Sequence, residues 1–276
     1  KADAHLHRIN CSYTRSVLEA LMRGDLSFLD GLVATNTCDH MLRLAGELKD
    51  KAGFPVHYFS MYHTLGEASR KWFVLEMEKL IRYIEESFSI KVSDEDLRRS
   101  ISVYNRTRRL MTQLGELRRS DPPAITGAEY LQIALVGMSV PREQFNDRLE
   151  ALLSSLRGRS AGRSASPRLM VIGGACDMPE FVEFIEARGV DVVADGLCFG
   201  ARRYQGVVDE NAEALLPAIA DHYLARIACP AIFDGFDSSY GILKQIVDAL
   251  MRTVREFCHN APQEDDVTVV AVKVQP

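Results

Sequence analysis

The sequence lacks an apolar run that is long enough to cross a membrane. Its longest apolar stretch, around residues 133–140, is far shorter than the roughly 20 residues of a membrane-spanning helix. The first residues, 1–7, contain no apolar core followed by a small-residue cleavage site, so they carry no export signal. We therefore expect a cytoplasmic protein with no membrane partner.

A broad basic surface is also missing, since the formal net charge is −5 at pH 7. The one dense basic stretch, residues 157–168, is interleaved with serine, alanine and glycine, a composition typical of a solvated linker. Nucleic-acid binding needs basic side chains gathered on one face. We therefore expect no nucleic-acid partner.

Closely spaced cysteines and the common catalytic motifs are absent as well. The chain has six cysteines, none in a CxxC pair, at positions 11, 38, 176, 198, 229 and 258. Without a secretory signal, disulfides are not expected, which leaves metal-binding, catalytic or core roles. The sequence has no GxSxG, Walker A or HExxH motif, so nothing favours a serine hydrolase, a P-loop nucleotide site or a zinc protease.

The first part of the sequence shows a βαβ pattern. Short β-branched runs at residues 31–35 and 56–59 predict parallel strands, and residues 12–23 and 40–51 predict helices. This order places Cys38 just past a strand, at the edge where open α/β sheets bind their ligands.

A helical section follows the first strand pair. Apolar residues spaced by three and four predict one long helix over residues 66–88. Two capping boxes, Ser93 with Asp96 and Thr126 with Glu129, each predict the start of a further helix. This part of the chain is therefore expected to be all helical up to the basic linker.

The βαβ pattern then returns. Strands are predicted at residues 169–172 and 190–193, with a helix from near Pro179 between them. Cys176 lies in the glycine-rich turn after the first of these strands, and Cys198 lies in the loop after the second. The layout of the first part of the chain is thus repeated.

These patterns predict an α/β fold with two Rossmann-like parallel-sheet units and a helical layer between them. The 276 residues exceed the roughly 100–150 of a typical single domain. We predict a partial first Rossmann-like domain at residues 1–65 and a helical region at residues 66–157. A linker at residues 158–167 leads to a second Rossmann-like domain at residues 168–249 and a tail at residues 250–276.

Cys11 and Cys38 are the sharpest candidates for a functional site. Each begins a predicted helix, where the positive end of the helix dipole favours a thiolate and hence metal ligation. The alternative is that each is a small buried apolar residue, the usual role of an unpaired cysteine. Cys198 and Cys229 lie in loops, where packing is the simpler interpretation and ligation the other. No catalytic acid or base is assigned, although His40 stands at the start of a predicted helix.

Two stretches carry a resemblance to a known family. They are AHLHRINCSYTRSVLE at residues 4–19 and LDGLVATNTCDH at residues 29–40, supported by Tyr104-Asn105 with Arg108 and by DGLCFGARR at residues 195–203. Over roughly residues 1–245 the sequence resembles the iron–sulfur subunits of the 2-hydroxyacyl-CoA dehydratase and benzoyl-CoA reductase family.

The resemblance implies a lyase or reductase of anaerobic metabolism that holds a 4Fe–4S cluster. It makes Cys11 and Cys38 cluster ligands, whereas the family's third ligand comes from a Phe-Cys-Asp motif that this sequence does not contain. It further implies radical (ketyl) chemistry on an acyl-CoA thioester, a second homologous subunit in a homo- or heterodimer, and an ATP-dependent iron–sulfur activator protein. Arg202 and Arg203 are candidates to bind CoA phosphates, or equally surface residues.

Two alternatives stay open beside this interpretation. A double-cubane (8Fe–9S) reductase of the same family would use Cys198 and Cys229 as additional metal ligands. A cluster-free scaffold or regulatory module would keep the fold without the chemistry. An iron count separates a double cubane from a single cluster, because the first holds about eight irons and the second about four.

The two ends of the chain depart from the family pattern. The first domain lacks its opening strand, so we expect a fragment truncated at the N-terminus. From about residue 250 the likeness is expected to stop, and residues 261–273, with Asp265 and Asp266, instead resemble the closing segment of metal-dependent serine/threonine phosphatases. We interpret this tail as a terminal β-strand of a fused fragment, with coincidence as the alternative.

Overall fold

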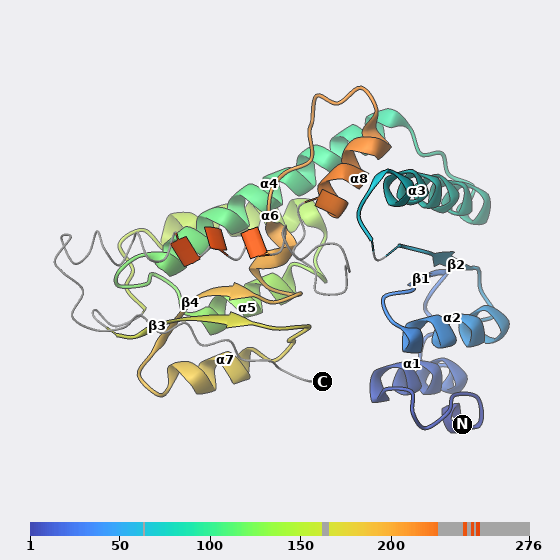
Figure 1. Ribbon diagram of the computed structural model, residues 1–276, viewed down its shortest axis with the longest axis horizontal. Coiled ribbons are helices and arrows are strands. Elements are labelled where there is room, and N and C mark those ends of the chain that lie inside the picture. The colour runs from blue at the N-terminus through green and yellow to red at the C-terminus, as the bar shows by residue number, and fades with distance from the viewer. Residues whose placement is uncertain (63, 162–165, 226–239, 242–243, 246, 249–276) are drawn as a thin grey trace. The chain divides into compact units, whose positions relative to one another are not determined.

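The computed structural model describes residues 1–62, 64–161, 166–225, 240–241, 244–245 and 247–248 (Figure 1). Helices alternate with two parallel strand pairs, which confirms the predicted α/β class. The chain divides into two compact units, one containing Lys1–Leu97 with Ala214–Asp221 and the other Arg98–Glu213 with residues 222–225. The domain boundaries drawn from the sequence stay a prediction. No helix in the described ranges is both long and apolar enough to cross a membrane.

The first unit is built on a pair of parallel strands. Figure 1 shows the α2 and α3 helices on opposite faces of this pair, and the α1 helix packs against α2. The crossover through α2 is what allows β1 and β2 to run parallel, with Leu32 opposite Val56. The elements are η1 (Ala2–Ala4), α1 (Ser12–Arg23), β1 (Leu32–Thr35), α2 (Asp39–Lys51), β2 (Val56–Phe59) and α3 (Glu67–Phe88).

Amphipathic helices form the core of the first unit. Leu18 of α1 packs with Leu44 and Leu48 of α2, and all three side chains are buried. The buried carboxylate of Glu76 in α3 accepts a hydrogen bond from the backbone N–H of Ser60, 2.8 Å away, just after β2. This carboxylate therefore ties α3 to the carboxyl end of the strand, and its partner Lys79 at 2.7 Å offsets its charge.

The second unit contains most of α4 and the second parallel pair. Both α5 and α7 contact β4, and they also contact one another. The β3 and β4 strands pair in parallel, with Val171 opposite Asp195. The elements are α4 (Asp94–Arg119), α5 (Gly127–Val136), α6 (Arg142–Ser155), β3 (Arg168–Ile172), α7 (Pro179–Glu186), β4 (Asp191–Gly196) and η2 (Ala201–Tyr204). The last helix, α8 (Leu215–Ala225), belongs to the first unit up to Asp221 and to the second unit from residue 222.

Two hydrophobic clusters hold the second unit together. One joins α4, α5 and α6 through Met111, Tyr130 and Leu149, which are almost fully buried. The other joins β3, β4 and α7 through Val171 and Val182 and the strand residues around them. Both capping boxes expected from the sequence are formed, at Ser93 for α4 and at Thr126 for α5.

Within the described ranges, the expected and observed elements differ clearly at the end of β4. The strand continues to Gly196, three residues beyond the predicted end at residue 193. Asp195 and Gly196 suggested a turn, yet both are paired with β3 and buried. The charged side chain of Asp195 can be buried within the strand because Arg118 of α4 neutralises its charge.

Candidate functional site

Cys11 and Cys38 occupy the same position in two neighbouring helices. Cys11 is the N-cap of α1 and Cys38 is the N-cap of α2, so each thiol lies at the positive end of a helix, as the sequence predicts. Both side chains are exposed. The interpretation of these cysteines as buried core residues is therefore wrong, whereas their role as ligands stays a prediction.

A hydrogen bond links the segments that carry these two cysteines. The Nδ1 atom of His40, in the first turn of α2, lies 3.3 Å from the Oδ1 atom of Asn10, which directly precedes Cys11. Asn10 is buried and also donates from its Nδ2 atom to the carbonyl of His7 at 3.0 Å. The tertiary fold thus brings together two helix starts that lie far apart in the sequence.

Cys11 has the environment of an activated thiol. The backbone N–H of Thr14 is the largest of the influences that lower the pKa of the Cys11 thiol below its ordinary value. The hydroxyl oxygen of Thr14 lies 3.6 Å from the sulfur and acts in the same direction, while partial burial opposes it. A thiolate is the form that ligates a metal, so this environment suits a metal ligand.

The donor set around these two thiols is compatible with part of an iron–sulfur site. Cysteine thiolates are the usual ligands of such clusters, and two accessible thiols at adjoining helix starts fit two of the ligand positions. Within the described residues, no group of three or more cysteine, histidine or carboxylate side chains is close enough to hold a metal ion. The residues described around Cys11 and Cys38 thus provide two candidate ligands and no third.

The other cysteines have different surroundings. Cys176 is buried in a hydrophobic cluster with Val171 and Val182, so it is a core residue. Cys198 is half-buried, and the guanidinium of Arg202 contacts its sulfur. Cys229 and Cys258, like the tail with its Asp265-Asp266 pair, lie outside the described residues.

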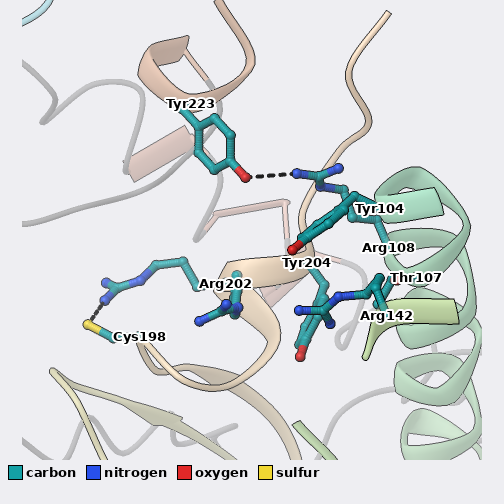
Figure 2. A pocket seen from close by; sticks show the side chains of 9 residues that line it. Tyr104, Thr107, Arg108, Arg142, Cys198, Arg202, Tyr204 and Tyr223 are labelled. Atoms are coloured by element: carbon teal, nitrogen blue, oxygen red, sulfur yellow. Dashed lines mark hydrogen bonds between the residues drawn. The ribbon is translucent and has the colours of Figure 1, made fainter. Parts of the chain in front are cut away.

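Cys198 lines a pocket of about 380 Å³ in the second unit (Figure 2). The pocket lies between α4, α6, the η2 turn and Tyr223 of α8, and the nine residues around it include four arginines and no carboxylate. The residues are Tyr104, Thr107, Arg108, Arg142, Cys198, Arg202, Arg203, Tyr204 and Tyr223.

Asp195 fixes the loop that forms one wall of this pocket. Its Oδ1 atom accepts hydrogen bonds from the backbone N–H groups of Leu197, at 3.1 Å, and Ala201, at 2.8 Å. Its Oδ2 atom accepts one from Arg118 of α4, at 2.8 Å. The loop that carries Cys198 and the η2 arginines is therefore held to α4 through one buried carboxylate.

Asn105 positions Arg108 on the opposite wall. The Oδ1 atom of this fully buried asparagine accepts hydrogen bonds from Arg108, at 3.1 Å, and from the backbone N–H of Val208, at 2.9 Å. Its Nδ2 atom donates to the Val208 carbonyl at 2.8 Å. Figure 2 shows the other end of the Arg108 guanidinium bonded to the hydroxyl of Tyr223, 3.0 Å away.

Sequence reasoning finds only part of this pocket. The sequence indicates Arg202 and Arg203 as candidates for phosphate binding. It does not indicate a role for Arg142, and Arg108 is noted only because it matches the family's sequence. Tyr104 and Arg108 are four positions apart in α4 and so share one face of the helix. That spacing is a signal from which these two members of the site could have been found.

A comparison with known protein families shows to which family the chain belongs. The model of the 2-hydroxyglutaryl-CoA dehydratase D-component family matches residues 1–264. The chain belongs to this family. The match continues past residue 250, where the resemblance was expected to stop, so the family's sequence pattern includes the first part of the predicted tail.

Curated relatives agree with this assignment. The chain is 29% identical over 249 residues to YjiM of Escherichia coli (strain K12), whose role as a dehydratase subunit is provisionally assigned; the match covers 84% of this chain and 62% of YjiM. It is 27% identical over 199 residues to a benzoyl-CoA reductase subunit of Thauera aromatica, covering 70% of this chain and 51% of that protein. The beta subunit of (R)-2-hydroxyglutaryl-CoA dehydratase from Acidaminococcus fermentans is 21% identical over 215 residues, or 76% of this chain and 56% of that protein. The chain thus spans only half to three-fifths of the length of these relatives.

Proposed function

We propose that the chain is the cluster-binding portion of an iron–sulfur subunit that acts on acyl-CoA thioesters, as a 2-hydroxyacyl-CoA dehydratase or an acyl-CoA reductase. The observation that carries this proposal is the arrangement of Cys11 and Cys38 at two helix starts joined by the contact between Asn10 and His40. Membership of the family supports it, because the relatives bear the names of dehydratase and reductase subunits.

In this proposal the chain's own residues hold the cluster in place. Cys11 and Cys38, each at the start of a helix, would each supply a sulfur ligand, and hydrogen bonding from Thr14 favours the thiolate form of Cys11. The cluster, when bound, supplies single electrons at low potential to the substrate. The protein's contribution is to orient the substrate and to keep water away from the site.

A second subunit is part of the proposal. Ile9 and Tyr13, which flank Cys11, are 75% and 65% exposed, and Leu42, near Cys38, is 49% exposed. Apolar side chains grouped around a reactive site are typical of a surface that another protein covers. We therefore propose a homologous partner subunit over this face, and an ATP-dependent activator protein as the electron donor.

The deciding experiment measures iron and acid-labile sulfide in the anaerobically prepared protein and records its ultraviolet–visible spectrum. We expect about four irons per chain and a broad thiolate-to-iron absorption, both lost in Cys38→Ser. The matched control is Cys198→Ser, which removes a thiol of the second unit and should leave the iron content unchanged.

Each other outcome has a definite meaning. An iron content of about eight per chain that falls in Cys198→Ser would indicate a double cubane instead of a single cluster. An iron-free, colourless protein with the native circular dichroism spectrum would contradict the proposal and favour the cluster-free scaffold.

A further inference from the structure

The proposed function is argued from the two cysteines of the first unit, and that argument does not draw on the arginine-lined pocket of the second unit. We propose that this pocket binds a diphosphate group. Its volume of about 380 Å³ lies within the roughly 300–1,000 Å³ of small-molecule sites. Three features carry the proposal: the charge of the pocket, the partners of its arginines and the residues that hold them.

The residues that line the pocket carry positive charge and no carboxylate. Arg108, Arg142, Arg202 and Arg203 converge on one space, and no aspartate or glutamate is among the residues around it. Like charges held together repel one another, and the repulsion is stronger away from bulk water. Binding of a multiply charged anion would relieve that repulsion.

Three of these arginines make no ion pair within the part of the chain that the structure describes. Arg108 donates only to neutral oxygens, those of Asn105 and Tyr223. Arg142 lies over the Tyr104 ring, 4.7 Å from its centre, and its buried Nε atom has no hydrogen-bond partner among the described residues.

Arg203 is the third, and it donates to the sulfur of Met138 at 3.1 Å. A thioether is a weak acceptor, so this contact leaves the guanidinium charge unbalanced. Arg108, Arg142 and Arg203 therefore keep donor capacity that an oxyanion can use.

Some arginines elsewhere in the same unit have carboxylate partners. Arg106 of α4 pairs with both Asp147 and Glu150, at 3.0 and 2.9 Å. Arg159 pairs with Glu129 at 2.6 Å. Other arginines of the unit, such as Arg168 and Arg188, donate to backbone carbonyls. What distinguishes the pocket is that four arginines line one space with no carboxylate among the lining residues.

The chemistry of the ligand follows from the donors. A guanidinium fork matches two oxygens of one phosphate, and several forks around one space match linked phosphates better than a single carboxylate. The walls are held in advance by Asn105 on one side and Asp195 on the other, so little ordering is left for the ligand to impose. A diphosphate is available free, in a nucleoside diphosphate, or as part of coenzyme A.

The test is isothermal titration calorimetry of the full chain with sodium pyrophosphate, in wild type and in Arg142→Gln. We expect binding of pyrophosphate, and a loss of at least tenfold in affinity in the variant. The matched control is Arg106→Gln, which removes the same charge from α4 outside the pocket and should change the affinity less than twofold. Arg203→Gln serves as a second pocket variant if circular dichroism shows that Arg142→Gln does not fold.

Further titrations identify the molecule that carries the diphosphate and test this inference separately from the proposed function. Equal affinity for pyrophosphate and ADP would support a site for the diphosphate alone. Tighter binding of coenzyme A than of either, weakened by Arg142→Gln, would support a carrier-bound diphosphate. Cys11→Ser should bind pyrophosphate like the wild type, whatever its iron content.

Three results would overturn the inference. One is no detectable heat with millimolar pyrophosphate. Another is an equal loss of affinity in Arg142→Gln and in Arg106→Gln, which would indicate general charge attraction. The third is inorganic phosphate binding as tightly as pyrophosphate, because the pocket would then recognise a single oxyanion.

Discussion

Arg118 and Asp195 form a buried ion pair, with 2.8 Å between Nη1 and Oδ2 and each side chain only 4% exposed. The Arg118 guanidinium also lies over the ring of Tyr130, 3.9 Å from its centre. The pair connects α4 to the end of β4, where the loop toward Cys198 begins. One carboxylate therefore serves both the packing of the second unit and the shape of the arginine pocket.

Breaking this pair should be costly. We expect Asp195→Asn to lower the free energy of unfolding by about 3–5 kcal/mol, because the Arg118 charge stays buried without its partner. Urea denaturation followed by circular dichroism measures the change. Asp147→Asn, which weakens an exposed pair with Arg106, should cost only about 0–1 kcal/mol. Equal costs for the two substitutions would show that the pair does not stabilise the unit.

Gly200 is required by the position of the Asp195 carboxylate. A Cβ atom at residue 200 would lie 2.0 Å from Oδ1 of Asp195, the atom that accepts the Ala201 N–H bond. We expect Gly200→Ala to destabilise the protein by about 1–3 kcal/mol through this clash. Gly174→Ala is the control, since a Cβ there meets no atom within 4 Å. Thermal unfolding of both variants measures the difference, and two similar melting temperatures would refute the prediction.

His57 should make the stability of the protein depend on pH. Burial lowers the pKa of His57 below its ordinary value, and the Lys79 charge acts the same way, while Glu76 opposes them. The unfolded imidazole takes up its proton near pH 6.5 and the folded one only at lower pH, so stability is present above about pH 6.5 and declines as the pH falls toward the lowered pKa.

The substitution His57→Gln removes this proton uptake. We expect the curve of unfolding free energy against pH to be flatter between pH 7 and 5 in this variant than in the wild type, over about the range in which an ordinary histidine titrates. Urea unfolding at a series of pH values gives the curves. An identical slope in wild type and His57→Gln would contradict the prediction.

The cysteines should differ in reactivity when no metal is bound. Cys11 and Cys38 are exposed, whereas Cys176 is 5% exposed in a hydrophobic cluster. A short pulse of N-ethylmaleimide on the reduced, iron-free protein should label the first two and spare Cys176, as peptide mass spectrometry would show. In urea all three should react alike. Protection of Cys11 and Cys38 in the native apoprotein would mean that another part of the protein covers them.

Much of the local structure could be predicted because its causes are local. The capping box of Thr126 and Glu129 lies within four residues of sequence, and both of its hydrogen bonds are formed. The helix after Cys11 and the one after Cys38 begin within a residue of their expected starts. Repeating patterns of apolar residues report which face of each helix is buried, and this needs no knowledge of the partner.

The arginine pocket could not be predicted in the same way. Arg108 meets Tyr223, 115 positions later, and Arg118 meets Asp195, 77 positions later. Nothing in the residues next to Asp195 indicates that a guanidinium neutralises it, so the strand was expected to end before this residue. Which arginines lack carboxylate partners is likewise a property of the packed helices.

The sequence by itself determined the α/β class, the helix starts that carry Cys11 and Cys38, and the resemblance that the family match confirms. These follow from short-range patterns of apolar, capping and motif residues. Only the tertiary structure decided that Asn10 joins His40 and that four arginines surround one pocket. Such juxtapositions depend on how distant segments pack, because the free energy of burying a charge or a hydrogen-bonding group is set by neighbours in space.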